Sequence, residues 1–257
     1  MKRKILPLLG LLGAALLPAA HHEEAGRQYL ELQTYQARTA ADAALLDKYL
    51  ESAFVPALKR QGLAPVGVFS EMEPEGAPRY FVLISYESLA QFAGVQEKLD
   101  ADAAYNKAAA EYFAAPRKEP RFTRMQSELL HAFEAFPQVH VPGQKKKGKD
   151  RLFELRTYES HTEDMGRLKV EMFNAGEVPI FLDAGIQPVF MGRALVGPHR
   201  PNLTYMTVFD DMPALEKAWA AFREHPDWKK LSGVEKYKGS VSKIHKTWLK
   251  PRPYSGL

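Results

Sequence analysis

A strand-like segment occurs twice in this chain of 257 residues, at a constant offset of 123 positions. YLELQTYQA at 29–37 and LFELRTYES at 152–160 carry Glu, Leu, Thr and Tyr at equivalent places, while Gln33 of the first copy becomes Arg156 in the second. The same ungapped register pairs Val55-Pro56 with Val178-Pro179, Gly62 with Gly185, Pro65-Val66 with Pro188-Val189, and Lys107 with Lys230. The chain is therefore a tandem duplication, and its fold must accommodate two similar units.

Hydrophobic periodicity predicts the same order of elements in both copies. The first copy predicts strands at 29–36, 64–71, 79–86 and 121–130, a helix at 40–61, and a second helix after YES at 86–88. The second copy predicts strands at 151–159, 186–195, 203–209 and 240–249, a helix at 163–184, and a second helix after FDDMP at 209–213. The order β-α-β-β-α-β is that of the ferredoxin-like unit, so the predicted fold class is α+β.

Several residues mark where these helices begin, bend and end. Pro56 and Pro179 lie inside the first helix of each copy, where a missing N–H and a steric clash predict a break. Gly62 and Gly185 stand where a helix C-terminus favours a left-handed residue. Asp211 is a candidate N-cap for the last long helix.

The first twenty residues differ in character from the rest. Lys2, Arg3 and Lys4 precede the apolar run ILPLLGLLGAALL, and small residues end the segment. This is the layout of a secretory signal peptide. The alternative is a membrane helix, which requires about 20 apolar residues, more than this run contains. We expect a signal peptide at 1–20, cleavage after Ala20, a secreted or periplasmic protein, and no stable membrane span in the mature chain.

Charge and cysteine content exclude several function classes. Loss of residues 1–20 removes three positive charges and takes the formal net charge from +4 to +1, so a nucleic-acid partner is not expected. The chain has no cysteine, which excludes disulfides, thiolate nucleophiles and Cys-based zinc sites. PQVHVPGQKKKGKD at 137–150 predicts a surface linker rather than an anion-binding patch, because its lysine run has no interleaved aromatic residues.

FELRTY at 153–158, EVPIFLDAGIQPVFMG at 177–192 and FREHPDW at 222–228 resemble the NIPSNAP family. The resemblance is strong over 152–249 and weaker over 29–130, where Gln33 replaces the arginine and Tyr105 replaces the tryptophan. It implies two tandem ferredoxin-like βαββαβ units packed as an intrachain pseudo-dimeric α/β barrel. The expected units are 27–136 and 151–250, followed by a C-terminal tail at 251–257.

Side chains alternate between the two faces of a strand. We expect Leu30, Leu32, Phe153 and Leu155 to pack on the helices of their own unit, which puts the polar face inside the barrel. The candidate barrel-interior, ligand-binding residues are then Glu31, Tyr35, Glu154, Arg156 and Tyr158. Enclosed charges need partners. One hypothesis is a structural network in which Arg156 pairs with Glu154 or, across the barrel, with Glu31. The other is a pocket in which Arg156 holds a carboxylate or another anionic group.

His245 on the last predicted strand is the remaining candidate. By analogy with haem-binding relatives in the wider superfamily it would be an axial haem ligand, and the alternative is an ordinary packed or solvated histidine. No HxxxH or HExxH spacing occurs, so no dedicated zinc site and no cofactor other than this haem alternative are expected.

Two main function classes remain. The first is an exported protein that binds a small organic molecule or interacts with a partner, without an established reaction; it is suggested by the family and by the absence of catalytic motifs. The second is a barrel-cavity enzyme, monooxygenase-like or haem-related, which rests on analogy between folds. A homo-oligomer of pseudo-dimers is a further expectation from the resemblance. Whether the protein is an enzyme is left open by the sequence.

Overall fold

The structure is a computed structural model that describes residues 26–143 and 151–257. The predicted signal peptide at 1–20 and the lysine run of the predicted linker lie outside the described residues. Within the described part of the chain, no helix is long and apolar enough to cross a membrane.

The first repeat contains strands β1 (Tyr29–Ala37), β2 (Gly67–Glu71), β3 (Arg79–Tyr86) and β4 (Phe122–Ala132). Its helices are α1 (Ala40–Tyr49), η1 (Leu50–Phe54), α2 (Val55–Arg60), α3 (Leu89–Ala93), α4 (Val95–Ala101) and α5 (Ala103–Phe113). The second repeat contains strands β5 (Leu152–Glu159), β6 (Gln187–Val196), β7 (Asn202–Phe209) and β8 (Lys243–Pro251). Its helices are α7 (Glu163–Met172), η2 (Phe173–Glu177), α8 (Val178–Asp183), α9 (Met212–Glu224), α10 (Pro226–Ser232) and η3 (Glu235–Tyr237). Both repeats follow the predicted βαββαβ order.

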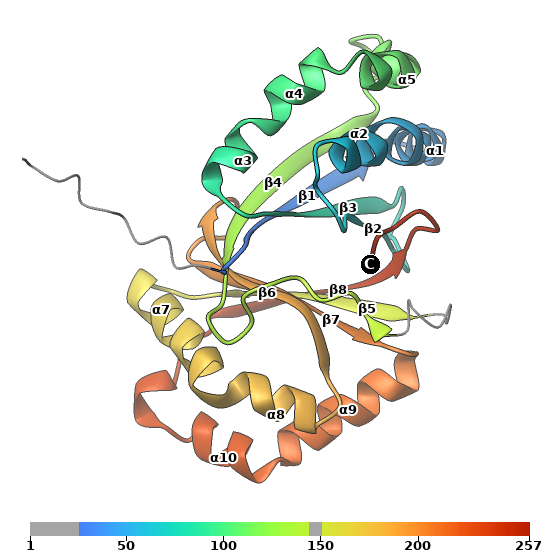
Figure 1. Ribbon diagram of the computed structural model, residues 1–257. Coiled ribbons are helices and arrows are strands. Elements are labelled where there is room, and N and C mark those ends of the chain that lie inside the picture. The colour runs from blue at the N-terminus through green and yellow to red at the C-terminus, as the bar shows by residue number, and fades with distance from the viewer. Residues whose placement is uncertain (1–25, 144–150) are drawn as a thin grey trace, which may run out of the picture.

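The strands close into one antiparallel barrel in the order β1-β3-β2-β8-β5-β7-β6-β4. The repeats are joined by two ladders, β2 with β8 and β4 with β6. Helices of the first repeat cover one side of the barrel and those of the second repeat cover the opposite side (Figure 1). The predicted intrachain pseudo-dimeric barrel is confirmed.

The prediction of which strand face points into the barrel was wrong. Leu30, Leu32, Phe153 and Leu155 belong to a buried apolar cluster drawn from strands of both repeats, which fills the barrel interior. The polar face lies beneath the helices instead: Tyr35 packs with residues of α1 and α5, and Tyr158 and its neighbours pack against α7, η2 and α9. Glu31, Glu154 and Arg156 share that face, so none of the five strand candidates lines the barrel interior.

The reversal has a simple physical cause. Two sheets that face each other across a barrel offer mainly strand side chains to one another, and apolar groups such as Phe69 and Phe153 pack there without needing partners. Charged groups are buried at low cost only where donors and acceptors reach them. On the outer face the helix residue Trp219 supplies such a partner to Glu154, and the strand residues Tyr86 and Ser127 supply partners to Glu31.

The helix details are largely as predicted. Gly62 and Gly185 have φ angles of 82° and 81°, in the left-handed region. The Asp211 side chain accepts a hydrogen bond from the backbone N–H of Ala214 and caps α9. The predicted break is present near Pro179, where Gly176 leaves helical angles (φ 175°, ψ -13°) and kinks the chain within η2. It is absent near Pro56, where η1 runs on into α2 through the helical residues Phe54 and Val55.

Residues 251–257, predicted to form a tail, pack on the first repeat. Leu257 is fully buried in the apolar cluster of the barrel interior. The Arg252 guanidinium pairs with Asp47, and the Tyr254 hydroxyl donates to the same carboxylate at 2.6 Å. The C-terminus therefore ties β8 to the helices of the other repeat.

One end of the barrel interior is polar. Thr204 donates to Oε2 of Glu128 at 3.2 Å and also lies 2.8 Å from the Thr157 hydroxyl. Oε1 of Glu128 is buried with no hydrogen-bond partner among the described residues. Burial raises the pKa of Glu128 to about 7, although hydrogen bonds from Asn202 and Thr204 oppose the shift. This carboxyl is therefore costly to ionise.

The shared interior predicts that neither half is stable alone. Residues 151–257, expressed without the first repeat, expose their face of the apolar cluster and lose both inter-repeat ladders. We expect this fragment to form a homodimer that rebuilds a barrel, or to aggregate, and analytical ultracentrifugation distinguishes these states. A stable monomer with cooperative unfolding would contradict the dependence on the shared interior.

The raised pKa of Glu128 predicts a pH-dependent stability. Because the carboxyl is harder to ionise in the folded state, stability falls as pH rises from the ordinary value of 4.5 to about 7. Glu128→Gln should raise the free energy of unfolding by about 2–3 kcal/mol at pH 8 and leave it nearly unchanged at pH 4. Urea titrations at both pH values measure the difference, with the exposed Glu75→Gln as control. An equal effect of Glu128→Gln at both pH values argues against this interpretation.

Candidate functional site

Each repeat has a cavity between the outer face of its sheet and its helices. The cavity of the second repeat has a volume of about 520 Å³, and that of the first repeat about 480 Å³. Glu154, Arg156 and Tyr158 line the former, and Tyr35 lines the latter. Four of the five strand candidates are thus divided between two equivalent cavities rather than gathered in one, and Glu31 is in the lining of neither.

In the second cavity, Arg156 and Glu154 form a buried pair under α9. Nη1 of Arg156 donates to Oε1 of Glu154 at 3.3 Å, and the indole Nε1 of Trp219 donates to Oε2 at 2.7 Å. The guanidinium lies over the Trp219 ring, 4.2 Å from its centroid, in cation–π geometry. Nε of Arg156 is buried without a hydrogen-bond partner in the described chain. Both carboxylate oxygens of Glu154 thus have a hydrogen-bond partner, whereas one donor of Arg156 has none among the described residues.

A second buried pair lies deeper in the same cavity. Nζ of Lys169 donates to Oε2 of Glu177 at 2.7 Å, and both side chains are almost completely buried. The ammonium also lies over the rings of Phe173 and Trp228, at 4.8 and 5.5 Å from their centroids. Burial raises the pKa of Glu177, and the charge of Lys169 opposes that rise. Glu177 ends η2, directly after the kink at Gly176.

Two cationic side chains also lie opposite each other on the paired strands that border the cavity. Arg156 on β5 stands directly opposite Lys246 on β8, and both line the cavity. Like charges in directly opposed positions destabilise a sheet. Lys246 is exposed, and next to it Ile244 and Trp248 expose 44% and 40% of their surface, which is unusual for large apolar side chains. The mouth of the cavity therefore combines positive charge with accessible apolar surface.

The hydroxyls behind this network are poor acids. Tyr158 and Tyr205 share a hydrogen bond of 2.8 Å between their oxygens. Burial raises the pKa of both phenols, and for Tyr205 it lies well above the ordinary value, so both remain protonated at neutral pH. They act as dipoles beside Arg156 rather than as charged groups.

The equivalent network of the first repeat is closed and has no arginine. Glu31 accepts hydrogen bonds from the Tyr86 hydroxyl at 2.7 Å, the Ser127 hydroxyl at 2.6 Å and the Gln33 amide at 3.0 Å. The Tyr35 hydroxyl donates to the Gln33 amide oxygen at 2.9 Å. Every partner here is a neutral donor, so the Glu31 network needs no ligand.

Sequence reasoning missed most of the residues that make the second cavity distinctive. At the offset of 123, Lys169, Glu177, Trp219 and Trp228 replace Leu46, Phe54, Gln96 and Tyr105. The positions at which the two repeats differ are therefore the signal in the sequence that indicates this site. Lys246 gives no such signal, because only the pairing of β5 with β8 brings it opposite Arg156.

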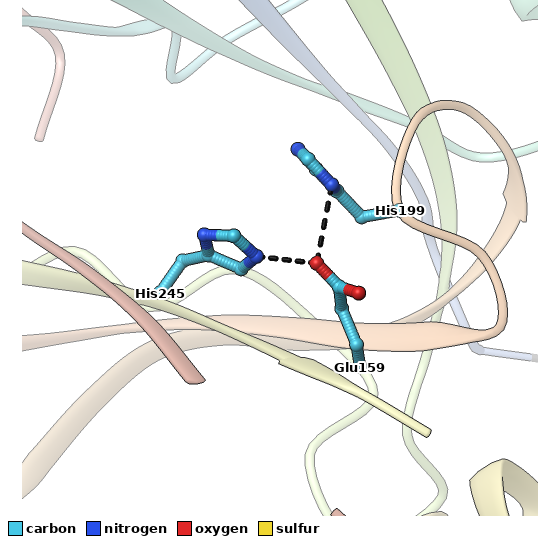
Figure 2. Close-up of side chains that lie close together, drawn as sticks. All are labelled: Glu159, His199 and His245. Atoms are coloured by element: carbon cyan, nitrogen blue, oxygen red, sulfur yellow. Dashed lines mark hydrogen bonds and ion pairs between the residues drawn. The ribbon is translucent and has the colours of Figure 1, made fainter. Parts of the chain in front are cut away.

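His245 lies apart from the other candidates. It alternates with Ile244, Lys246 and Trp248 and so points to the opposite face of β8 from the cavity. There it contacts Glu159 and stands beside His199, as Figure 2 shows. The structure thus brings Glu154, Arg156 and Tyr158 together and leaves His245 in a separate cluster.

Comparison with solved structures shows a known fold. The chain is similar to a proposed monooxygenase from Fusobacterium nucleatum, with a TM-score of 0.57 at 8% identity, covering 88% of this chain and 93% of that one. A proposed monooxygenase from Lactobacillus acidophilus gives a TM-score of 0.57 at 10% identity, with 88% and 94% covered. An anthrone oxidase-like protein gives 0.51 at 11% identity, with 88% and 92% covered. At these identities the likeness concerns the fold alone.

Sequence comparison is more specific. None of the curated proteins matches the chain at a significant level. The family model described as NIPSNAP matches residues 30–136 and again residues 153–256, and so covers both repeats and most of the chain. The resemblance of the strand and helix motifs is confirmed, and the chain belongs to the NIPSNAP family.

Proposed function

We propose that the second repeat binds a small organic molecule that carries an anionic group, such as a carboxylate. The observation that carries the proposal is the opposition of Arg156 and Lys246 across β5 and β8, both lining one cavity. An anion between the two cations turns their repulsion into attraction. The first repeat has Gln33 opposite Ser127 at this place and serves as an internal comparison.

The partners of Arg156 support an added ligand. Its contact with Glu154 is long, at 3.3 Å, and the carboxylate is also held by Trp219 at 2.7 Å. Nε of the guanidinium has no hydrogen-bond partner among the described residues. A planar guanidinium with an unused donor suits the geometry of a carboxylate.

The walls of the cavity suggest the rest of the ligand. A volume of about 520 Å³ is within the range of sites that hold drug-sized molecules. Trp219, Phe222 and Trp228 line the interior, and Trp248 lies at the exposed border. We propose a ligand with a flat apolar body that lies against these rings and a head group that reaches Arg156 and Lys246.

Turnover in the same cavity is a second candidate. It is favoured by the buried ion pair of Lys169 and Glu177, whose carboxyl has a raised pKa, and by a fold shared with proposed monooxygenases. Mass spectrometry of a bound ligand before and after incubation in air distinguishes binding from turnover. A ligand recovered unchanged contradicts this second candidate.

We also propose export to the periplasm or the medium, because residues 1–20 have a basic start, an apolar run and small residues at the end, as a signal peptide does. Amino-terminal sequencing of the protein from its native host tests it. An intact Met1 in a cytoplasmic fraction contradicts export.

Ligand binding predicts a charge-dependent thermal shift. Aromatic carboxylates, such as naphthoate and indole acetate, should raise the Tm of the wild-type protein, because a ligand that binds only the folded state stabilises it. The corresponding primary amides should give little or no shift, since they lack the charge. Amides that act as strongly as acids, or acids without any effect, would contradict the proposed anion site.

Substitutions at the two cations separate binding from folding. Arg156→Gln copies Gln33 and should abolish the shift given by carboxylates, while lowering the apo free energy of unfolding by about 3 kcal/mol because Glu154 loses its counter-charge. Lys246→Gln removes only the exposed partner; apo stability should be unchanged or raised by about 0.5 kcal/mol, and the carboxylate shift reduced. Lys217→Gln, on the surface of α9, is the matched control. If carboxylates raise the Tm of both Lys246→Gln and Arg156→Gln as much as that of the wild type, the proposed site is ruled out. The role of Arg156 is then to balance Glu154 in a structural network.

A further inference from the structure

A second polar cluster lies away from the cavity, where one end of the barrel opens. Glu159 ends β5, His245 lies on the neighbouring strand β8, and His199 lies in the connection between β6 and β7 (Figure 2). The β5–β8 ladder brings His245 close to Glu159, because His245 is opposite Thr157, which is two residues from Glu159 on the same face. The β5–β7 ladder puts Glu159 opposite Asn202, at the end of the connection that carries His199. Three segments remote in sequence thus converge on one point.

The contacts are directed at a single atom. Oε1 of Glu159 lies 3.2 Å from Nδ1 of His199, and the same oxygen contacts Nε2 of His245. One ligand atom from each of the three residues lies within 4.8 Å of the other two. The imidazole rings face each other obliquely, with centroids 4.7 Å apart and planes inclined by 37°.

The spacing of Glu159 and His199 suits a metal ion. A tetrahedral ion with bonds of 2.0–2.1 Å holds its ligand atoms about 3.3 Å apart, close to the separation of Glu159 from His199. Two imidazoles and one carboxylate form a set that binds zinc and other first-row transition metals, with the remaining positions open to water. The side chains of Glu159, His245 and His199 are 23%, 33% and 49% exposed, so an ion can enter from solvent.

Comparison of the repeats shows that the cluster is specific to the second copy. Gln36 stands at the position of Glu159, and Gln126 stands opposite Thr34 as His245 stands opposite Thr157. Neutral amides therefore replace both strand ligands in the first repeat.

The backbone at His199 gives an independent indication. Its φ angle is 62°, and His199 is the one non-glycine residue with positive φ among the described residues. At the offset of 123 the first repeat has Gly76, whose φ is 110° and which bears no steric cost there. Strained positions of this kind concentrate at functional sites. His199 therefore adopts a backbone conformation that is strained for a residue other than glycine, and in this conformation its imidazole contacts Glu159.

The connection that carries His199 is anchored. The Asn202 side chain donates to the Pro198 carbonyl at 2.9 Å, so the turn is held to the start of β7. A histidine fixed in this way loses little freedom when it binds an ion.

We propose that Glu159, His199 and His245 form a binding site for a divalent first-row transition metal, with zinc as the test ion. The atoms that face one another are Oε1 of Glu159, Nδ1 of His199 and Nε2 of His245, and these would bind the ion. The site is separate from the cavity of the second repeat and does not depend on the ligand proposed there.

Calorimetric titration of untagged protein with Zn²⁺ tests the site. The wild-type protein should bind one ion, and Co²⁺ should give the visible absorption of a coordinated ion. Glu159→Gln and His245→Ala should each weaken binding at least tenfold, as loss of one of three ligands requires. His199→Gly, which copies Gly76, should weaken it equally while leaving the Tm unchanged or higher, because glycine relieves the strain.

The control variants are His161→Ala, an exposed histidine two residues after Glu159, and His21→Ala with His22→Ala near the amino terminus. All should bind zinc as the wild type does. Zinc affinity unchanged in His199→Gly and Glu159→Gln would overturn the proposal, and so would the failure of Zn²⁺, Co²⁺, Ni²⁺, Mn²⁺ and Fe²⁺ to bind at all. In either case the cluster is a hydrogen-bonded contact of two histidines with a glutamate.

Discussion

The structure depends on an apolar barrel interior that both repeats must build together. Leu32 and Phe69 of the first repeat and Phe153 and Met206 of the second belong to one buried cluster, which Leu257 also enters. Neither sheet can bury this surface alone, and each would leave strand edges unpaired. The burial of shared apolar area, with the β2–β8 and β4–β6 ladders, therefore makes two homologous units into one folded body.

A dry interior determines where charge can be tolerated. Because alternate residues of β1 and β5 fill the barrel, the charged and phenolic residues between them lie beneath the helices. A buried charge is tolerated there only if a hydrogen-bonding side chain reaches it, either from a helix, as Trp219 reaches Glu154, or from a neighbouring strand, as Tyr86 reaches Glu31. The same arrangement leaves a cavity between sheet and helices. The packing of the barrel interior thus determines where the candidate site lies, although no residue of that interior lines the site.

After the duplication, each copy could change at positions that are not needed to close the barrel. The first repeat satisfies Glu31 with neutral donors, and Leu46 and Phe54 fill the space that Lys169 and Glu177 occupy in the second. Both the anion site and the metal site proposed above fall in the second repeat. Their residues lie off the shared apolar cluster, so they could change without loss of the barrel.

The sequence by itself determined the duplication, the order of elements, the glycines at the helix ends and the family. These features are local or repeat at a fixed offset, so they can be read along the chain. Alternation in β5 sorts Glu154, Arg156 and Tyr158 onto one face, but it does not say whether that face meets the barrel or the helices. Only the tertiary structure decided this, because the answer depends on what the opposite sheet and the helices offer. It also decided that Lys246 opposes Arg156, since contacts between remote segments follow from strand register, which no local pattern in the chain specifies.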